Sequence, residues 1–251
     1  MRWFAILLAA WGLAGCASQS GGQPQDASHA RALAKARTEL AADYYERTQY
    51  SVALDELAKA VRADSRYAPA YNVRGLVHMA LREDVKAEDD FKSSLSLDPD
   101  NSDTHNNYGW FLCQRGRERE AVKHFLIAVR DPLYTTPGKA YLNAGVCSRK
   151  AGEMQDAEMY LQRALSLEPG LPEALGELAE VAFINGDYAS AKSYFGRFEQ
   201  ASTAPLSAEN LLLAVRIEHK LGNRDVESAY AMRLRKNFPD SREAKILGQI
   251  R

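Results

Sequence analysis

The chain has 251 residues, of which 46% are hydrophobic and 26% charged, and its formal net charge at pH 7 is -1. This composition is typical of a folded globular protein and excludes a largely disordered chain. A net charge close to zero provides no strongly basic face, so nucleic-acid binding is disfavoured.

The first 15 residues have the organisation of a secretory signal peptide. Arg2 is followed by an apolar run from Trp3 to Leu13, which is shorter than the roughly 20 residues that a membrane-spanning helix needs. The run ends in "LAGC", which resembles the lipobox of bacterial lipoproteins and predicts that Cys16 is lipidated. A plain cleaved signal with an incidental cysteine is the alternative. Under the sorting rule of that class, Ala17 favours the outer membrane, with the protein facing the periplasm.

Residues 16–30 are predicted to be the lipidated cysteine and a flexible tether. The stretch "ASQSGGQPQDAS" is small, polar and rich in Gly, Ser, Gln and Pro, which is the composition of flexible linkers. A coil of this length reaches roughly 20 Å. We therefore expect the folded part to stay close to the membrane.

Residues 31–251 predict an all-α, right-handed superhelix of six helical hairpins. Gly75 and Gly109 are 109 - 75 = 34 residues apart, and the same spacing separates Phe91 from Phe125. This period, with a small residue, an alanine, an aromatic residue and a closing proline, is the tetratricopeptide pattern. The units lie near 34–67, 68–101, 102–137, 138–171, 172–207 and 208–241, and a tail at 242–251 is expected to cap the array.

Glycines have two predicted roles in this array. Gly75, Gly109 and Gly145 stand where the two helices of a unit meet, and the turn glycines, such as Gly152, suit a left-handed helix end. The sixth unit departs from the pattern because Val215 replaces the packing glycine. This departure leaves open whether the sixth unit caps the array or contacts a partner.

The first helices of stacked hairpins line a concave surface, and helical spacing indicates which side chains face it. In the first three units this row is largely apolar, and exposed apolar stripes mark interaction sites. Asparagines flank the row and resemble the residues with which tetratricopeptide clamps hold an extended peptide. The alternative is that Leu76, Met79 and Trp110 pack against neighbouring helices and leave no groove. The predicted partner-binding residues are Tyr45, Asn72, Leu76, Met79, Asn106, Asn107, Trp110 and Asn143.

Enzymatic chemistry is not indicated, and we expect no catalytic residue, metal or cofactor. None of the five histidines has a metal-ligand spacing with another histidine or cysteine, and there is no phosphate-binding glycine loop or serine elbow. Cys113 could be considered as a nucleophile with His105 or His124 as its base, but its position in the repeat explains it without catalysis. His105 is expected to pack against its neighbours. Whether Cys113 and Cys147 form a disulfide stays an open question, because an oxidising compartment permits the bond but the sequence does not supply the Cα separation.

Three runs go beyond the repeat consensus: "HNNYGWFLC" (105–113), "DPLYTTP" (131–137) and "NAGVC" (143–147). They closely resemble signature runs of the PilF/PilW family of type IV pilus biogenesis lipoproteins. The resemblance implies a pilotin, an outer-membrane lipoprotein that binds the secretin subunit and promotes its localisation and assembly into a multimeric pore. The partner that it implies is a protein. The near-neutral net charge disfavours nucleic acid, and a capped array has no obvious need to dimerise, so we expect a monomer. Residues 131–137 are either a turn with Pro137 opening the next helix or a direct partner contact.

The main alternative function is a general periplasmic scaffold lipoprotein that gathers cell-wall or division enzymes. Many periplasmic arrays of this repeat have that role. The two functions predict different consequences of deletion: loss of surface pili and of the secretin multimer for the pilotin, and altered cell shape with normal secretin for the scaffold.

Overall fold

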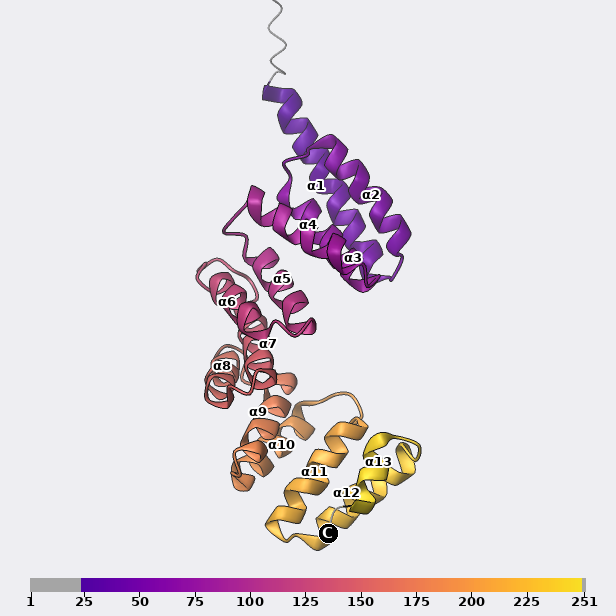
Figure 1. The fold of residues 1–251 in the computed structure, drawn as a ribbon, viewed down its shortest axis with the longest axis vertical. Coiled ribbons are helices and arrows are strands. Elements are labelled where there is room, and N and C mark those ends of the chain that lie inside the picture. The colour runs from indigo at the N-terminus through magenta and orange to yellow at the C-terminus, as the bar shows by residue number, and fades with distance from the viewer. Residues whose placement is uncertain (1–23, 250–251) are drawn as a thin grey trace, which may run out of the picture.

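A computed structural model describes residues 24–249, and these form one continuous curved stack of helices (Figure 1). The predicted signal peptide, Cys16 and residues 17–23 of the tether lie outside this range. The elements are α1 (Pro24–Glu46), α2 (Tyr50–Ala63), α3 (Ala68–Ala80), α4 (Asp84–Leu97), α5 (Ser102–Gln114), α6 (Glu118–Ala128), α7 (Pro137–Lys150), α8 (Met154–Leu167), α9 (Pro172–Ile184), α10 (Tyr188–Ala201), α11 (Ala208–Leu221), α12 (Arg224–Asn237), α13 (Arg242–Ile246) and the short 3-10 helix η1 (Leu247–Gln249).

Consecutive helices pair as hairpins, from α1 with α2 to α11 with α12, and the first helix of each hairpin also contacts the first helix of the next. The odd-numbered helices from α1 to α11 therefore line one face of the stack. The part of the chain that the structure describes contains no strand, so the prediction of an all-α array is confirmed. Within the same residues, no helix has the length and hydropathy that crossing a bilayer requires.

The two helices of a hairpin approach closely because the first carries a residue without a side chain. A Cβ added at Gly109 would lie 2.8 Å from Cε1 of Phe125, and one added at Gly145 would lie 2.5 Å from Cγ of Leu161. Gly75 meets Phe91 in the same way. These glycines cost helix propensity, about 1 kcal/mol each against alanine, but they allow the facing side chain to be fully buried.

The turn inside each hairpin needs one residue in the left-handed conformation. Gly152 has φ of 80° there, and the backbone N–H of Glu153 donates to the carbonyl of Ser148 at 2.9 Å, which closes the end of α7. In the first two hairpins the same kind of turn is made by Thr48 and Arg82, with φ of 58° and 59°. A left-handed backbone costs a residue with a Cβ about 1–2 kcal/mol, so these two turns are strained.

The start of α1 corrects one prediction. Residues 24–30 were expected to belong to the flexible tether, but α1 already begins at Pro24. Proline is favourable at the first helical position, Asp26 lies in the first turn where it complements the helix dipole, and Ala27 and Ala30 are strong helix formers. The general linker composition of this segment concealed these start signals.

The C-terminal tail folds back on the last hairpin, and α13 contacts both α11 and α12. Leu247 is buried in the apolar cluster that also contains Val215 and Leu234. The side chain of Val215, at the position where other units have glycine, is 1% exposed and forms part of this core. Residues 242–249 thus cover the end of the array.

Candidate partner-binding surface

Helices α3, α5 and α7 carry most of the predicted binding residues, and their mutual contacts place these residues on the inner face of the stack. Tyr45 comes from α1 and is half-buried, with its ring centroid 6.0 Å from that of Tyr50. Burial raises the pKa of Tyr45, so its phenol stays neutral at physiological pH. Tyr45 packs against the core of the first hairpin and is only partly buried there.

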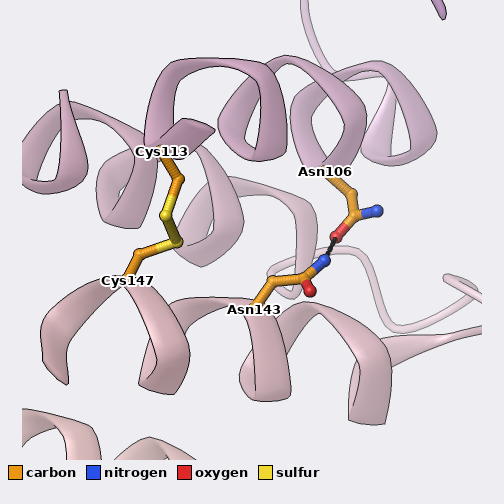
Figure 2. Close-up of a disulfide and its surroundings, with 4 residues drawn as sticks. All are labelled: Asn106, Cys113, Asn143 and Cys147. Carbon is orange, nitrogen blue, oxygen red and sulfur yellow. Dashed lines mark hydrogen bonds between the residues drawn. A yellow bond between two sulfur atoms is a disulfide. The ribbon is translucent and has the colours of Figure 1, made fainter. Parts of the chain in front are cut away.

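The four asparagines form a chain of hydrogen bonds across three helices. Asn143 Nδ2 donates to Asn106 Oδ1 at 3.0 Å, as Figure 2 shows, and Asn107 Nδ2 donates to Asn72 Oδ1 at 3.2 Å. Asn106 Nδ2 lies 3.5 Å from Asn107 Oδ1, which completes the chain. We call these four residues the amide ladder.

The amide ladder changes the role expected for these residues. Asn72, Asn106 and Asn143 are between 5% and 8% exposed, whereas a clamp residue would present its amide to the ligand. Buried amides need partners, and here each amide satisfies its neighbour. The ladder therefore joins α3, α5 and α7 from unit to unit. Asn107 is less buried than the other three and remains the member best placed to meet a ligand.

The apolar residues beside the ladder have an intermediate position. Leu76, Met79 and Trp110 are partly buried and pack against the cluster formed by residues such as Phe111. The ammonium of Lys150 lies 5.8 Å from the centroid of the Trp110 ring, where cation–π attraction applies. These residues thus pack against neighbouring helices and also keep part of their surface on the inner face. We call them the apolar strip.

A disulfide links α5 to α7 next to this surface. Cys113 and Cys147 are bonded, with their Cα atoms 5.9 Å apart (Figure 2). Both side chains are buried, at 2% and 0% exposed. The disulfide answers the question that sequence left open, and it removes Cys113 as a nucleophile because a bonded sulfur is not a thiolate. It also fixes the separation of the helices that carry Trp110 and Asn143.

The histidines near the surface have structural partners. His105 is 5% exposed, and its Nε2 donates to the carbonyl oxygen of Pro99 at 2.8 Å. Its Nδ1 therefore accepts from His124 Nδ1, also at 2.8 Å. Burial, and then the neighbouring His105, lower the pKa of His124 to about 4, so this ring is neutral at pH 7. His105 packs against its neighbours, as the sequence predicts.

An ionic cluster centred on Glu88 links α4 to α5 and to the start of α6. Burial alone would raise the pKa of Glu88, but hydrogen bonds from Arg117, Lys92 and Tyr108 lower it to about 2. The Tyr108 hydroxyl donates to Glu88 at 2.9 Å, and burial followed by this contact raises the pKa of Tyr108. This arrangement ties α4, α5 and α6 together and holds no group prepared for acid–base work near pH 7.

The loop 131–137 has two parts. Tyr134 is 9% exposed and packs with Ala128 and Ala140, which anchors the loop between α6 and α7, while Leu133 is 85% exposed. Pro137 is the first residue of α7, as the turn interpretation predicts. Sequence reasoning missed Leu133 because alternation between an anchored and an exposed side chain in an irregular loop has no periodic signal.

A second concavity lies further along the inner face, where sequence reasoning named no site. It has a volume of about 430 Å³ and is bordered by α7, α9, α10 and α11. The signal for it was the change of the inner row from apolar to charged residues after the fourth unit, for example at Glu180. Among the described residues, no three His, Cys, Asp or Glu side chains gather closely enough to hold a metal ion.

Comparison with known proteins supports the fold. A family model for the tetratricopeptide repeat matches residues 38–102 and 149–205, and a second model of the same description matches residues 91–123. A solved structure of PilW, described as a widely conserved type IV pilus biogenesis factor, superposes with a TM-score of 0.79 at 36% identity. That match covers 85% of this chain and 97% of PilW.

Two further relatives extend the comparison. The Pseudomonas aeruginosa type IV pilus assembly protein PilF is 28% identical over 239 residues, which is 95% of this chain and 94% of PilF. A solved structure of Pseudomonas aeruginosa PilF has a TM-score of 0.81 and covers 90% of this chain and 99% of that chain. An uncharacterised Haemophilus influenzae protein is 28% identical over 170 residues, covering 65% of this chain and 89% of that protein.

Stacked hairpins with one continuous inner surface define a tetratricopeptide repeat protein, a class that uses such surfaces for protein–protein interaction. The matches to PilW and PilF run over most of this chain and nearly all of each relative. The chain belongs to the type IV pilus biogenesis family of tetratricopeptide repeat proteins.

Proposed function

We propose that the protein is a pilotin: a lipoprotein that binds the type IV pilus secretin subunit and promotes its localisation and assembly in the outer membrane. The observation that supports this most is the similarity to PilW and PilF along nearly their whole length. The lipobox-like "LAGC" and the tetratricopeptide array supply the two parts that such a role needs, an anchor and a binding surface.

The localisation follows from the N-terminal sequence. With Cys16 lipidated and Ala17 after it, the protein is held at the periplasmic face of the outer membrane. Because one acyl chain holds a protein only reversibly, stable anchoring needs the several chains that this class of lipoprotein carries. The helical start at Pro24 leaves only residues 17–23 between the anchor and α1, a shorter link than the sequence alone suggests.

The apolar strip with Asn107 is the proposed secretin-binding surface. Leu76, Met79 and Trp110 are partly buried, and covering their remaining apolar area with a partner gains free energy, at about 25 cal/mol per Å² buried. The amide ladder and the disulfide hold α3, α5 and α7 in place before the partner arrives. A surface that is already ordered loses less conformational entropy on binding.

The experiment complements a deletion strain with Trp110→Glu, with Met79→Glu, or with the matched control Met159→Glu. Met159 is 51% exposed and lies on α8, outside the strip, so its substitution adds the same charge elsewhere. Circular dichroism of each purified variant checks that the helices are retained. The readouts are surface pili and the detergent-resistant secretin multimer in outer-membrane fractions.

We expect the deletion to abolish both readouts, Met159→Glu to restore them, and the two strip variants to fail although they are folded. Folded strip variants that restore secretin assembly fully would refute the assignment of the surface. A deletion strain with normal secretin multimers and altered cell shape would refute the pilotin function and favour the general scaffold.

A further inference from the structure

The second concavity on the inner face differs in chemistry from the apolar strip. Its walls carry the carboxylates of Glu173, Glu177, Glu180 and Glu209, and we call it the acidic groove. Its base includes Phe198, an aromatic residue. A volume of about 430 Å³ is within the range of sites that bind ligands or side chains of a partner.

The charges in the acidic groove are not balanced within the fold. Arg149 is the only basic side chain that lines it, and its Nε donates to Glu177 at 2.6 Å. Among the described residues, Glu173, Glu180 and Glu209 have no cationic side chain within 4.0 Å, although ion pairs are frequent elsewhere on the protein. Arg216 is not available to them in this structure, because its guanidinium lies over the ring of Phe183 at 4.9 Å.

Three of these carboxylates follow one another along α9. Glu173 and Glu177 are one turn apart, and Glu180 is almost one turn further on, so all three lie on one side of the helix. Glu173 lies in the first turn, where a negative charge is favourable, and Glu177 pairs with Arg149 of α7. Like charges at this spacing nevertheless repel one another, and among the described residues no ion pair offsets the charge of Glu180. From Glu173 to Glu180 the stripe is about 10 Å long at 1.5 Å per residue, too long for one metal ion to bridge.

The base of the groove suits the aliphatic part of a basic side chain. Phe198 and Leu213 come from α10 and α11 and are packed into the core below. Gly176 lies between Glu173 and Glu177 on α9 and has no side chain to cover Phe198, whereas an added Cβ would contact that ring at 3.6 Å. Lysine and arginine place their apolar stems on such surfaces while the charged end meets a carboxylate.

We propose that the acidic groove binds a segment of another polypeptide that carries lysine or arginine side chains. Glu173 and Glu180, the two α9 carboxylates of the groove without an ion pair among the described residues, are roughly 10 Å apart along the helix. Alternate residues of an extended segment are about 6.6 Å apart, a difference that two long, flexible basic side chains can span. Two successive cationic side chains can therefore meet two carboxylates, with their stems over Phe198 and Leu213. The groove lies on α9 and α11, away from the apolar strip on α3 and α5, so this proposal does not depend on the secretin assignment.

The test is a binding titration on the full-length chain, purified in uncharged detergent, with a fluorescent peptide of alternating lysine and alanine. A peptide of alternating glutamate and alanine is the probe control. The test variant is Glu173→Gln/Glu180→Gln, which removes two charges without changing side-chain size. The matched control is Glu46→Gln/Glu118→Gln, which makes the same change in net charge on α1 and α6.

We expect the lysine peptide to bind the wild-type protein and the glutamate peptide not to bind. The groove variant should weaken lysine-peptide binding by about tenfold or more, the control variant by less than about twofold, and affinity should fall as salt rises. Equal weakening by both variants would mean attraction to net charge alone and would overturn the proposal. Unchanged binding by the groove variant, or competition by free spermidine as effective as by unlabelled peptide, would overturn it too.

Discussion

Breaking the disulfide between Cys113 and Cys147 is expected to destabilise the middle of the array strongly. The bond joins α5 to α7, the first helices of two successive hairpins, with a sequence separation of 34 residues. Both cysteines are buried, and a buried free thiol packs as a small apolar group. Reduction should therefore leave the native packing nearly intact and act mainly by releasing the unfolded chain.

The magnitude follows from the size of the closed loop. For 34 residues, the loop-closure entropy is about 12.6 cal/mol/K, which is about 3.8 kcal/mol at 25 °C. Since each 1.4 kcal/mol is a factor of ten, reduction should increase the unfolding equilibrium constant by roughly 500-fold. In a stack where each hairpin contacts only its neighbours, we expect this loss to centre on the hairpins that contain α5 and α7.

The assay is urea unfolding of the wild-type chain with and without reductant, followed by circular dichroism, together with Cys113→Ala/Cys147→Ala. Native-state hydrogen exchange locates the effect, with α11 as the internal reference. We expect reductant to destabilise the wild type but not the double variant, and protection to fall in α5 and α7 more than in α11. Oxidised and reduced wild-type protein with equal unfolding free energy would refute the reasoning.

Two further predictions concern the turns and the buried histidine pair. Arg82→Gly should stabilise the protein by about 0.5–1 kcal/mol, because it relieves a left-handed backbone that costs about 1–2 kcal/mol and adds the smaller entropy cost of glycine. Gly152→Ala should destabilise the protein, because it places a Cβ on a left-handed residue. Thermal unfolding measures both effects, and a lower melting temperature for Arg82→Gly would contradict the strain. On folding, the pKa of His124 falls from an ordinary value near 6.5 to about 4. Between these two pH values the unfolded chain binds a proton that the folded chain does not. The free energy of unfolding should therefore fall by about 1–2 kcal/mol from pH 7 to pH 5, after allowance for partial exposure. His124→Asn, which keeps a donor toward His105, should show a smaller loss over this interval in urea unfolding; equal losses would exclude His124 as the source.

The repeat could be predicted because its signal is local and periodic. The spacing of Gly75, Gly109 and their facing aromatic residues reflects contacts within one hairpin, which involve residues only 16 positions apart. Each unit repeats those contacts, so their recurrence is visible without coordinates. The start of α1 was missed because the cap signals around Pro24 and Asp26 are short and do not recur.

The sequence by itself thus determined the helical hairpins, their order and which helices line the inner face. Only the tertiary structure decided how neighbouring units meet: that Asn143 donates to Asn106, that Cys113 is bonded to Cys147, and that Glu180 lines a groove to which α11 also contributes. The physical reason is that hairpin formation depends on short-range helical spacing, whereas the rotation between stacked units depends on side-chain packing across interfaces. A periodic pattern specifies which residues face the next unit, and the packed geometry specifies which atoms touch.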